Sequence, residues 1–346
     1  MTLARAARAA VVVGLALAFS AVAAGCLGGG NSGSGTVTVT TAGASSGGPA
    51  DSLQREFVQV VDDVSPSVVQ IETPQGLGSG VVYDDKGDIV TNAHVVGTAT
   101  NVRVTLSSGA RHPGTVVGAF PPNDVAVVHV EGATPRPATF REASPISVGD
   151  IVLAIGNPLG LRSSVTQGIV SSLGRTVSAG NGIALPSVIQ TSAAINPGNS
   201  GGALVDLRSE VIGIPTLAAL DPEFGSTPAP GIGFAIPSSS VRRIADQLIA
   251  TGKVTASGRA YLGIRVATLV SGGVLVASVQ AGGPAADAGM EQGDLIVAVN
   301  GKQVRSTDDL ATALAEIKPG TTIPVKVDRH GTTTTLHVKV GELQSP

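Results

Sequence analysis

The stretch Asn196-Pro197-Gly198-Asn199-Ser200-Gly201-Gly202 holds a serine on a short turn between glycines. Such a turn presents the hydroxyl and the backbone N–H of the serine to one carbonyl carbon, which is what acyl transfer requires. Ser200 is therefore the candidate nucleophile. Gly198 can direct a second N–H to the same point, because no side chain blocks the approaching oxygen. The stretch predicts an oxyanion hole formed by Gly198 and Ser200.

Two upstream segments supply partners for this serine. In Thr91-Asn92-Ala93-His94-Val95-Val96, an apolar strand is predicted to end in a histidine, and in Asn123-Asp124-Val125-Ala126 an aspartate stands at the mouth of another apolar strand. A lone histidine at a strand end is usually structural, and a lone aspartate beside an asparagine is usually a turn residue. The order His94, Asp124, Ser200 is, however, the order of the chymotrypsin triad, which favours a base, an orienting carboxylate and a nucleophile.

With two further motifs, these segments resemble the HtrA (Deg) family of trypsin-like serine proteases. The resemblance covers roughly residues 53–341 and also rests on Ala193-Ala194-Ile195 before the serine turn and on Gly231-Ile232-Gly233-Phe234-Ala235-Ile236-Pro237. It implies catalytic roles for His94, Asp124 and Ser200. It implies substrate contacts for a second set of residues, namely Ala194, Ile195, Gly231, Ile232, Gly233 and Phe234.

The chain departs from the family pattern at two places. Ser192 occupies a position next to the predicted specificity pocket where the family commonly has an aspartate. The connection that leads into the strand beginning at Gly78 contains only residues 73–77, so the long regulatory loop that some family members have at this point is missing. No acidic residue accompanies Ala193, Ala194 and Ile195 in the predicted pocket wall, which favours a small aliphatic side chain before the cut.

The composition and the turn-forming residues between apolar runs predict a mainly β chain. The 346 residues are 42% hydrophobic and include no Trp, so cores must be built from Val, Ile, Leu and Ala. Val-rich runs bounded by Gly, Pro, Asn and Asp favour short antiparallel strands. We expect two six-stranded antiparallel barrels of the chymotrypsin type in residues 53–252, with His94 and Asp124 on the first and Ser200 on the second. An amphipathic helix capped by residues 238–240 and ended by Gly252 closes this domain, and 253–259 form a linker.

A PDZ domain of α+β type is expected in residues 260–343. The segment Tyr261-Leu262-Gly263-Ile264 resembles the PDZ loop that grips a peptide's C-terminal carboxylate. An incoming chain end would add a strand at Ile264 and lie against a helix at 307–317, which begins with a capping box of Ser306 and Asp309. The competing interpretation is a small structural module with no ligand.

The charge and the histidine and cysteine content exclude several classes of protein. A net charge of -3 gives no basic footprint for nucleic acid. The five His residues are scattered and there is one Cys, so the sequence predicts no metal site and no cofactor, and Cys26 cannot form an intrachain disulfide.

The N-terminus indicates a membrane tether. Arg5 and Arg8 precede an apolar run, and Cys26 follows small residues, which resembles a bacterial lipoprotein signal in residues 1–27 with lipidation of Cys26. An uncleaved membrane helix from about residue 9 to 27 is the alternative. Residues 28–52 are rich in Gly, Ser and Thr and read as a flexible linker. Either interpretation places the remaining chain outside the cytoplasm of a bacterial cell.

The resemblance implies a serine endopeptidase that acts on misfolded or exposed polypeptides, is gated by peptide C-termini on the PDZ domain, and assembles as a homotrimer. Phe57, in a short helix before the first barrel, is a candidate for the trimer contact. Two rivals remain: a noncatalytic PDZ-dependent chaperone or sensor with a vestigial protease domain, and an esterase with the same triad.

Overall fold

The computed structural model describes residues 48–345 apart from 133–134, 143–144, 158–163, 181, 197, 222–226 and 270–272. Cys26, the predicted signal or anchor and most of the predicted linker therefore lie outside the described residues. Among the helices that are described, none has the length and hydropathy that a membrane span requires.

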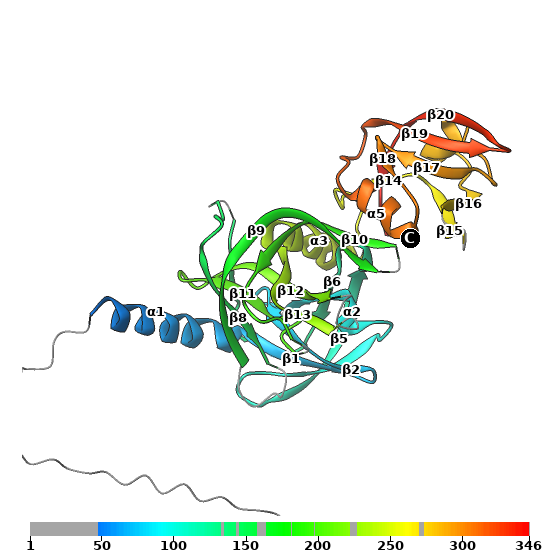
Figure 1. The fold of residues 1–346 in the computed structure, drawn as a ribbon. Helices are drawn as coiled ribbons and strands as arrows, with labels where there is room; N and C mark the ends of the chain where they lie inside the picture. Colours follow the sequence, from blue (N-terminus) through cyan, green and yellow to red (C-terminus); the bar gives the residue numbers. More distant parts are fainter. Residues whose placement is uncertain are drawn as a thin grey trace, which may run out of the picture. The chain divides into compact units, whose positions relative to one another are not determined.

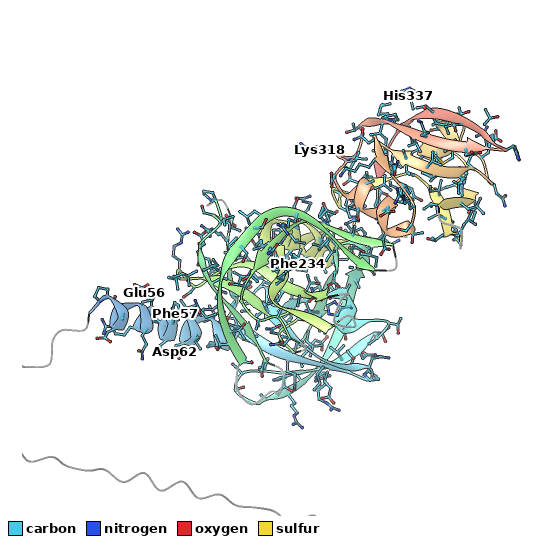
Figure 2. The ribbon with its side chains drawn as sticks, in the orientation of Figure 1. Glu56, Phe57, Asp62, Phe234, Lys318 and His337 are labelled. Atoms are coloured by element: carbon cyan, nitrogen blue, oxygen red, sulfur yellow. The ribbon has the colours of Figure 1, made fainter. Side chains whose placement is uncertain are left out.

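Helix α1 (Pro49–Val64) leads into the first barrel through a 3-10 turn, η1 (Ser65–Ser67). The predicted linker extended to residue 52, whereas the helix already begins at Pro49, a residue whose fixed φ suits the first helical position. Val60 and Val64 are buried in the core of the body that follows, and Phe57 packs against the same core from one turn earlier (Figure 2).

The first barrel contains six antiparallel strands in the closed order β1-β2-β3-β6-β5-β4. Their bounds are β1 Val68–Thr73, β2 Gly76–Val82, β3 Asp88–Thr91, β4 Asn101–Thr105, β5 Arg111–Phe120 and β6 Val125–His129. β1 and β2 form a hairpin in which Thr73 pairs with Gly76, so the turn there is as short as the sequence indicates. Valine and isoleucine side chains fill the interior, as expected for a chain with few aromatic residues.

The second barrel closes through β11-β8-β9-β10-β13-β12, because β11 also pairs with β12 (Figure 1). Its strands are β8 Ile151–Gly156, β9 Ser164–Gly180, β10 Ile183–Thr191, β11 Ala203–Asp206, β12 Glu210–Asp221 and β13 Thr227–Pro237. A two-residue strand, β7 (Thr139–Phe140), adds to β12 in parallel. Both predicted six-stranded barrels are thus confirmed, and β7 is a small addition that the sequence analysis did not include.

Helix α3 (Ser238–Thr251) closes the two-barrel body and ends at Gly252, which adopts φ 69°. The predicted serine cap is wrong: Pro237 occupies the N-cap position, and no side chain caps the helix. Ser238 instead donates its hydroxyl hydrogen to the carbonyl of Arg141 at 3.0 Å. Asp246 of α3 accepts from the Tyr83 hydroxyl at 2.5 Å, and burial together with this carboxylate raises the pKa of Tyr83.

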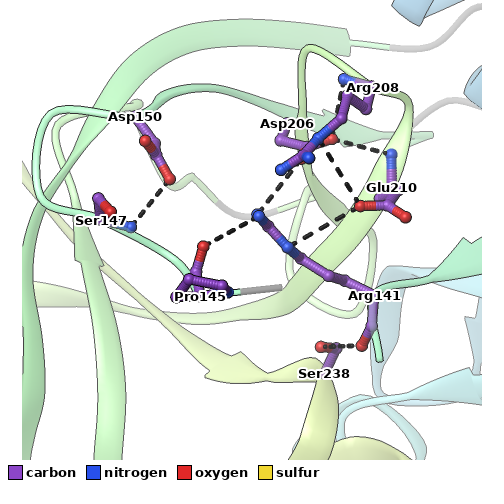
Figure 3. A network of polar contacts seen from close by, with 8 residues as sticks. All are labelled: Arg141, Pro145, Ser147, Asp150, Asp206, Arg208, Glu210 and Ser238. Atoms are coloured by element: carbon purple, nitrogen blue, oxygen red, sulfur yellow. Dashed lines mark hydrogen bonds and ion pairs between the residues drawn. The ribbon is translucent and has the colours of Figure 1, made fainter. Parts of the chain in front are cut away.

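A buried ion-pair network anchors the connection between the barrels (Figure 3). The guanidinium of Arg141, which is 5% exposed, donates to Asp206 at 3.3 Å and to the carbonyl of Pro145 at 3.0 Å. Asp206 also accepts from the backbone N–H groups of Arg208 and Glu210. The network joins the segment after β7 to the turn between β11 and β12, and it places the guanidinium groups of Arg141 and Arg208 beside the carboxylates of Asp206 and Glu210.

The C-terminal domain has its own apolar core and a sheet in the order β15-β16-β17-β19-β20, with β15 at one edge. Its elements are β14 Ala260–Tyr261, β15 Ile264–Thr268, β16 Val274–Val279, α4 Pro284–Asp287, β17 Leu295–Val299, β18 Lys302–Gln303, α5 Thr307–Ala315, β19 Thr322–Arg329, β20 Thr332–Lys339 and β21 Gly341–Glu342. The predicted capping box is confirmed, since Ser306 and Asp309 exchange side-chain to backbone hydrogen bonds at the start of α5.

Candidate active site

His94 and Asp124 meet at one end of the first barrel. His94 lies in the short helix α2 (Ala93–Val96), directly after β3, rather than at the end of the strand itself. Asp124 follows the 3-10 turn η2 (Pro121–Asn123) and takes φ 52°, a left-handed conformation that aspartate tolerates better than most residues. The side-chain amide of Asn92 donates to the Asp124 carbonyl at 3.0 Å and holds this turn in place.

The Asp124 carboxylate accepts three kinds of donor. The backbone N–H of His94 lies 3.0 Å from Oδ1, the His94 Nδ1 lies 2.9 Å from Oδ2, and the Thr216 hydroxyl lies 2.5 Å from Oδ2. Because an ionised carboxylate can only accept, His94 Nδ1 carries the hydrogen and Nε2 keeps its lone pair. The ring is 47% exposed, whereas the Asp124 side chain is 12% exposed. The arrangement therefore presents an oriented base to the solvent side.

Ser200 is brought to the same place through Thr216 of β12. Its hydroxyl lies 3.4 Å from the Thr216 carbonyl, and the Thr216 side chain is the one that donates to Asp124. Ser200 and His94 both belong to the described residues, and no hydrogen bond joins their side chains. A bond of 3.4 Å is long for a hydroxyl donor, and nucleophile contacts in a ligand-free site are often loose.

The turn around Ser200 is held by an asparagine. The Asn199 side chain accepts from the Asn196 N–H at 3.0 Å and donates to the Ala194 carbonyl at 2.9 Å. Gly198 adopts φ 113°. Within the described residues, the N–H groups of Gly198 and Ser200 have no hydrogen-bond partner, which leaves two donors free beside the hydroxyl. Pro197 lies outside the described residues.

The residues assigned to the substrate pocket lie on β13 and on the loop that precedes Ser200. Ile195 is buried against Gly233, where an added Cβ would stand 2.3 Å from Ile195 Cγ1. Phe234 is buried (Figure 2), whereas Ala194, Gly231 and Ile232 are exposed. Ser192, at the departure from the family pattern, accepts from the Ile169 N–H at 3.0 Å. A neutral hydroxyl thus fills that position with a backbone partner.

The assigned peptide loop of the C-terminal domain lies between β14 and the edge strand β15. The Leu262 carbonyl accepts from the N–H of Ala285 and the Gly263 carbonyl from the N–H of Gln280, each at 2.9 Å. Tyr261 donates its hydroxyl hydrogen to the Gln280 side chain at 2.6 Å. Ile264 begins β15, which has a partner strand on one side only. The loop is therefore braced beside an open sheet edge.

Metal ligands do not gather in the part of the chain that the structure describes, where no group of three His, Cys, Asp or Glu side chains is placed to hold an ion.

Comparisons with known proteins match both halves of the chain. A trypsin-like peptidase domain matches residues 78–214, and a PDZ domain matches residues 260–340. The HtrA-type protease AlgW, solved with a decapeptide, is 31% identical, with a TM-score of 0.57 over 84% of this chain and 99% of that one. The chain belongs to the HtrA family.

Other members of the family support the same placement. The serine protease PepD of Mycobacterium tuberculosis is 41% identical over 315 residues, which are 83% of this chain and 66% of PepD. A DegP-like periplasmic serine endoprotease of Chlamydia trachomatis is 39% identical over 277 residues, 77% of this chain and 54% of that protein. The serine endoprotease from Yersinia pestis is 36% identical, with a TM-score of 0.58 over 83% of this chain and 98% of that one. The chain thus spans about half to two thirds of the lengths of PepD and the DegP-like protein.

Sequence reasoning missed two residues of the site, Thr216 and Ser79. Thr216 stands in an apolar strand, and its polarity among buried neighbours is the signal that could have found it. Ser79 stands between Gly78 and Gly80 in a buried part of β2, where an unpaired hydroxyl would be costly. A buried polar residue in a strand interior needs a partner: the Thr216 hydroxyl donates to Asp124, and the Ser79 hydroxyl donates to the Gly198 carbonyl.

Proposed function

We propose that this chain is a serine endopeptidase in which His94, Asp124 and Ser200 form the catalytic triad. The observation that carries the proposal is the convergence of the His94 ring and the Thr216 hydroxyl on the Asp124 carboxylate, with the Thr216 carbonyl at the nucleophile. One carboxylate thereby fixes the tautomer of the base and connects it to the turn that bears Ser200.

The reaction divides into acylation and hydrolysis. His94 Nε2 takes the proton of Ser200 as Oγ forms a bond to the peptide carbonyl carbon, and the resulting imidazolium is stabilised by Asp124. The carbonyl oxygen becomes an oxyanion between the N–H groups of Gly198 and Ser200. His94 then gives its proton to the leaving amine, and water, activated in the same way, releases the acyl group.

The apolar residues beside Ser200 support a preference for small aliphatic side chains before the cut. Ile195 fills the space against Gly233, and Ala193 beside it is buried, so the wall of the pocket is apolar. Ser192 supplies no charge that would favour lysine or arginine. Burying a valine or alanine side chain against an apolar wall is favourable, whereas burying a charged side chain there costs desolvation free energy.

The PDZ domain is proposed to bind peptide C-termini. The braced loop at residues 261–264 and the open edge of β15 suit a chain end that adds as a strand, as PDZ ligands do. Peptide binding there would favour the catalytically ordered oxyanion hole, which couples the two domains. AlgW was solved with a decapeptide, and the match with this chain covers 99% of AlgW as solved, which supports peptide binding by this chain as well.

We further propose that the chain acts outside the cytoplasm as a membrane-tethered homotrimer on misfolded or exposed polypeptides. The periplasmic naming of the DegP-like relatives supports the compartment. The tether rests on the N-terminal sequence, as a lipidated Cys26 or a membrane helix, and Phe57 of α1 remains the candidate for the trimer contact.

Mass spectrometry of the products from a denatured protein tests this proposal. Wild-type chain is expected to cut after small aliphatic residues, and Ser200→Ala is expected to release no products. Cleavage chiefly after lysine or arginine would refute the pocket assignment. Absence of cleavage together with absence of serine labelling would favour the noncatalytic chaperone or sensor, and turnover of esters without peptides would indicate an esterase.

A further inference from the structure

Ser79, a buried residue of β2, holds both residues of the proposed oxyanion hole. Its backbone N–H donates to the Ser200 carbonyl at 2.9 Å. Its hydroxyl donates to the Gly198 carbonyl at 2.5 Å. Ser79 belongs to the first barrel, whereas the nucleophile turn belongs to the second, so one side chain of the barrel that carries His94 anchors the turn that carries Ser200.

The Ser79 hydroxyl is oriented by a second contact. The N–H of Asn157, at the end of β8, donates to Ser79 Oγ at 2.8 Å. Because an amide N–H can only donate, the hydroxyl hydrogen of Ser79 points to the Gly198 carbonyl. The Ser79 carbonyl in turn accepts from the Thr91 hydroxyl at 2.7 Å. Every polar group of Ser79 is thus engaged, and its position is fixed from three directions.

Glycines permit this close approach of the two barrels. A Cβ at Gly201 would stand 2.2 Å from the Ser79 carbonyl oxygen and 2.4 Å from the Thr91 hydroxyl oxygen, both of which belong to the first barrel. The space between the turn and the first barrel is therefore closed. Loss of the Ser79 hydroxyl would leave the Gly198 carbonyl and the Asn157 N–H as unpaired buried groups.

We propose that Ser79 is a positioning residue for the oxyanion hole, an inference that rests on the proposed function. Glycine has wide backbone freedom, so Gly198 does not by itself hold its N–H in one direction. Anchoring its carbonyl fixes the peptide plane on one side of the Cα atom, so fewer combinations of φ and ψ, and hence fewer directions of the N–H, remain open to Gly198. The oxyanion exists only in the transition state and the tetrahedral intermediate, so Ser79 affects turnover rather than substrate binding.

Two variants of Ser79 and one matched control test this role in the full chain. Ser79→Ala removes the hydroxyl, and Ser79→Cys keeps the buried volume with a weak donor. Ser238→Ala removes a buried hydroxyl that also donates to a backbone carbonyl, at Arg141, in a different part of the body. The readouts are kcat and KM for a peptide p-nitroanilide with valine before the cut, the inhibition constant of the matching peptide aldehyde, and the urea unfolding midpoint.

Deleting an oxyanion donor costs about 100- to 1000-fold in rate, and misdirecting one costs less, so we expect both Ser79 variants to lose about 10- to 100-fold in kcat. KM should change by less than about 2-fold, and the aldehyde, whose adduct carries an oxyanion, should weaken by the same factor as kcat. Ser238→Ala should keep kcat and the aldehyde affinity even if its unfolding midpoint falls.

Three results would overturn the inference: wild-type kcat in both Ser79 variants, a loss of kcat without a loss of aldehyde affinity, or equal losses in the Ser238 control at equal unfolding midpoint. If Ser79→Ala does not fold, Ser79→Cys decides the question by the same readouts. A wild-type chain that neither cleaves peptides nor reacts with a fluorophosphonate would instead refute the proposed function.

Discussion

Replacing Asp124 by asparagine should remove nearly all activity while leaving the fold in place. The carboxylate accepts from the His94 backbone N–H, the His94 ring and the Thr216 hydroxyl. An amide of the same shape has one oxygen to accept with and one NH2 that cannot accept. If the NH2 faces the ring, His94 Nδ1 becomes the acceptor and the hydrogen moves to Nε2, the atom that must take the Ser200 proton.

The size of this effect follows from the wrong tautomer. Substitution of the corresponding carboxylate in a serine triad lowers kcat about 10,000-fold, and four factors of ten at about 1.4 kcal/mol each correspond to about 5.6 kcal/mol of transition-state free energy. A hydrogen bond to a charged group contributes about 1.5–3 kcal/mol to stability, so the loss of activity should exceed the loss of stability.

A second histidine–aspartate pair on the same barrel supplies the control. His129 Nδ1 lies 2.8 Å from Asp88 Oδ1, at the end of β3 away from His94. Steady-state peptide cleavage by Asp124→Asn and Asp88→Asn, with urea unfolding of each, separates catalysis from folding. The reasoning fails if Asp124→Asn keeps more than about a tenth of wild-type kcat/KM, or if Asp88→Asn loses as much at equal stability.

Three further predictions follow from other parts of the chain. Ser200→Ala should abolish hydrolysis but leave the affinity of a fluorescent C-terminal peptide for the PDZ domain unchanged, and a parallel loss of binding would contradict the separation of the two sites. Arg141→Met should lower the free energy of unfolding by about 1.5–3 kcal/mol, because the buried Asp206 carboxylate loses one charged donor but keeps Arg208. Unchanged stability in urea denaturation would show that the contacts of Arg141 in Figure 3 are dispensable. Arg329 holds the pKa of the Asp294 carboxyl below its usual value, so the PDZ domain should lose stability as pH falls below about 4, the unfolded pKa of a carboxyl. Hydrogen exchange of residues 260–343 should show that Asp294→Asn is already less stable at pH 7 and that its stability is less sensitive to acid. Equal acid sensitivity in the wild-type and variant chains would exclude this pair as the cause.

The sequence was sufficient for the strands because their signals are local. Short apolar runs bounded by turn residues, such as the run at β3, are typical of strands. Both barrels were predicted from such runs. Helix α3 was predicted for the same reason, from its apolar face and Gly252. Its serine cap was wrong because the hydroxyl of Ser238 is drawn to Arg141, a partner 97 residues away along the chain that no local pattern could reveal.

The triad candidates were found from motifs, whereas the groups that hold them were not. Thr216 and Ser79 matter because β12 and β2 come together at the nucleophile turn, and this proximity is a property of the closed barrels. β7 escaped prediction because two residues are too few to show a period, and its pairing depends on β12. Non-local hydrogen bonds of this kind enter through packing, so sequence patterns indicate the polar residue but not its partner.

Covalent labelling of the intact chain tests the central claim most directly. The wild-type chain is treated with a fluorophosphonate, digested, and analysed by mass spectrometry, with His94→Ala as the companion. The account predicts one adduct, on Ser200, formed rapidly in the wild-type chain and far more slowly when the histidine is removed. Failure of Ser200 to react, or equally rapid labelling of both chains, would contradict it.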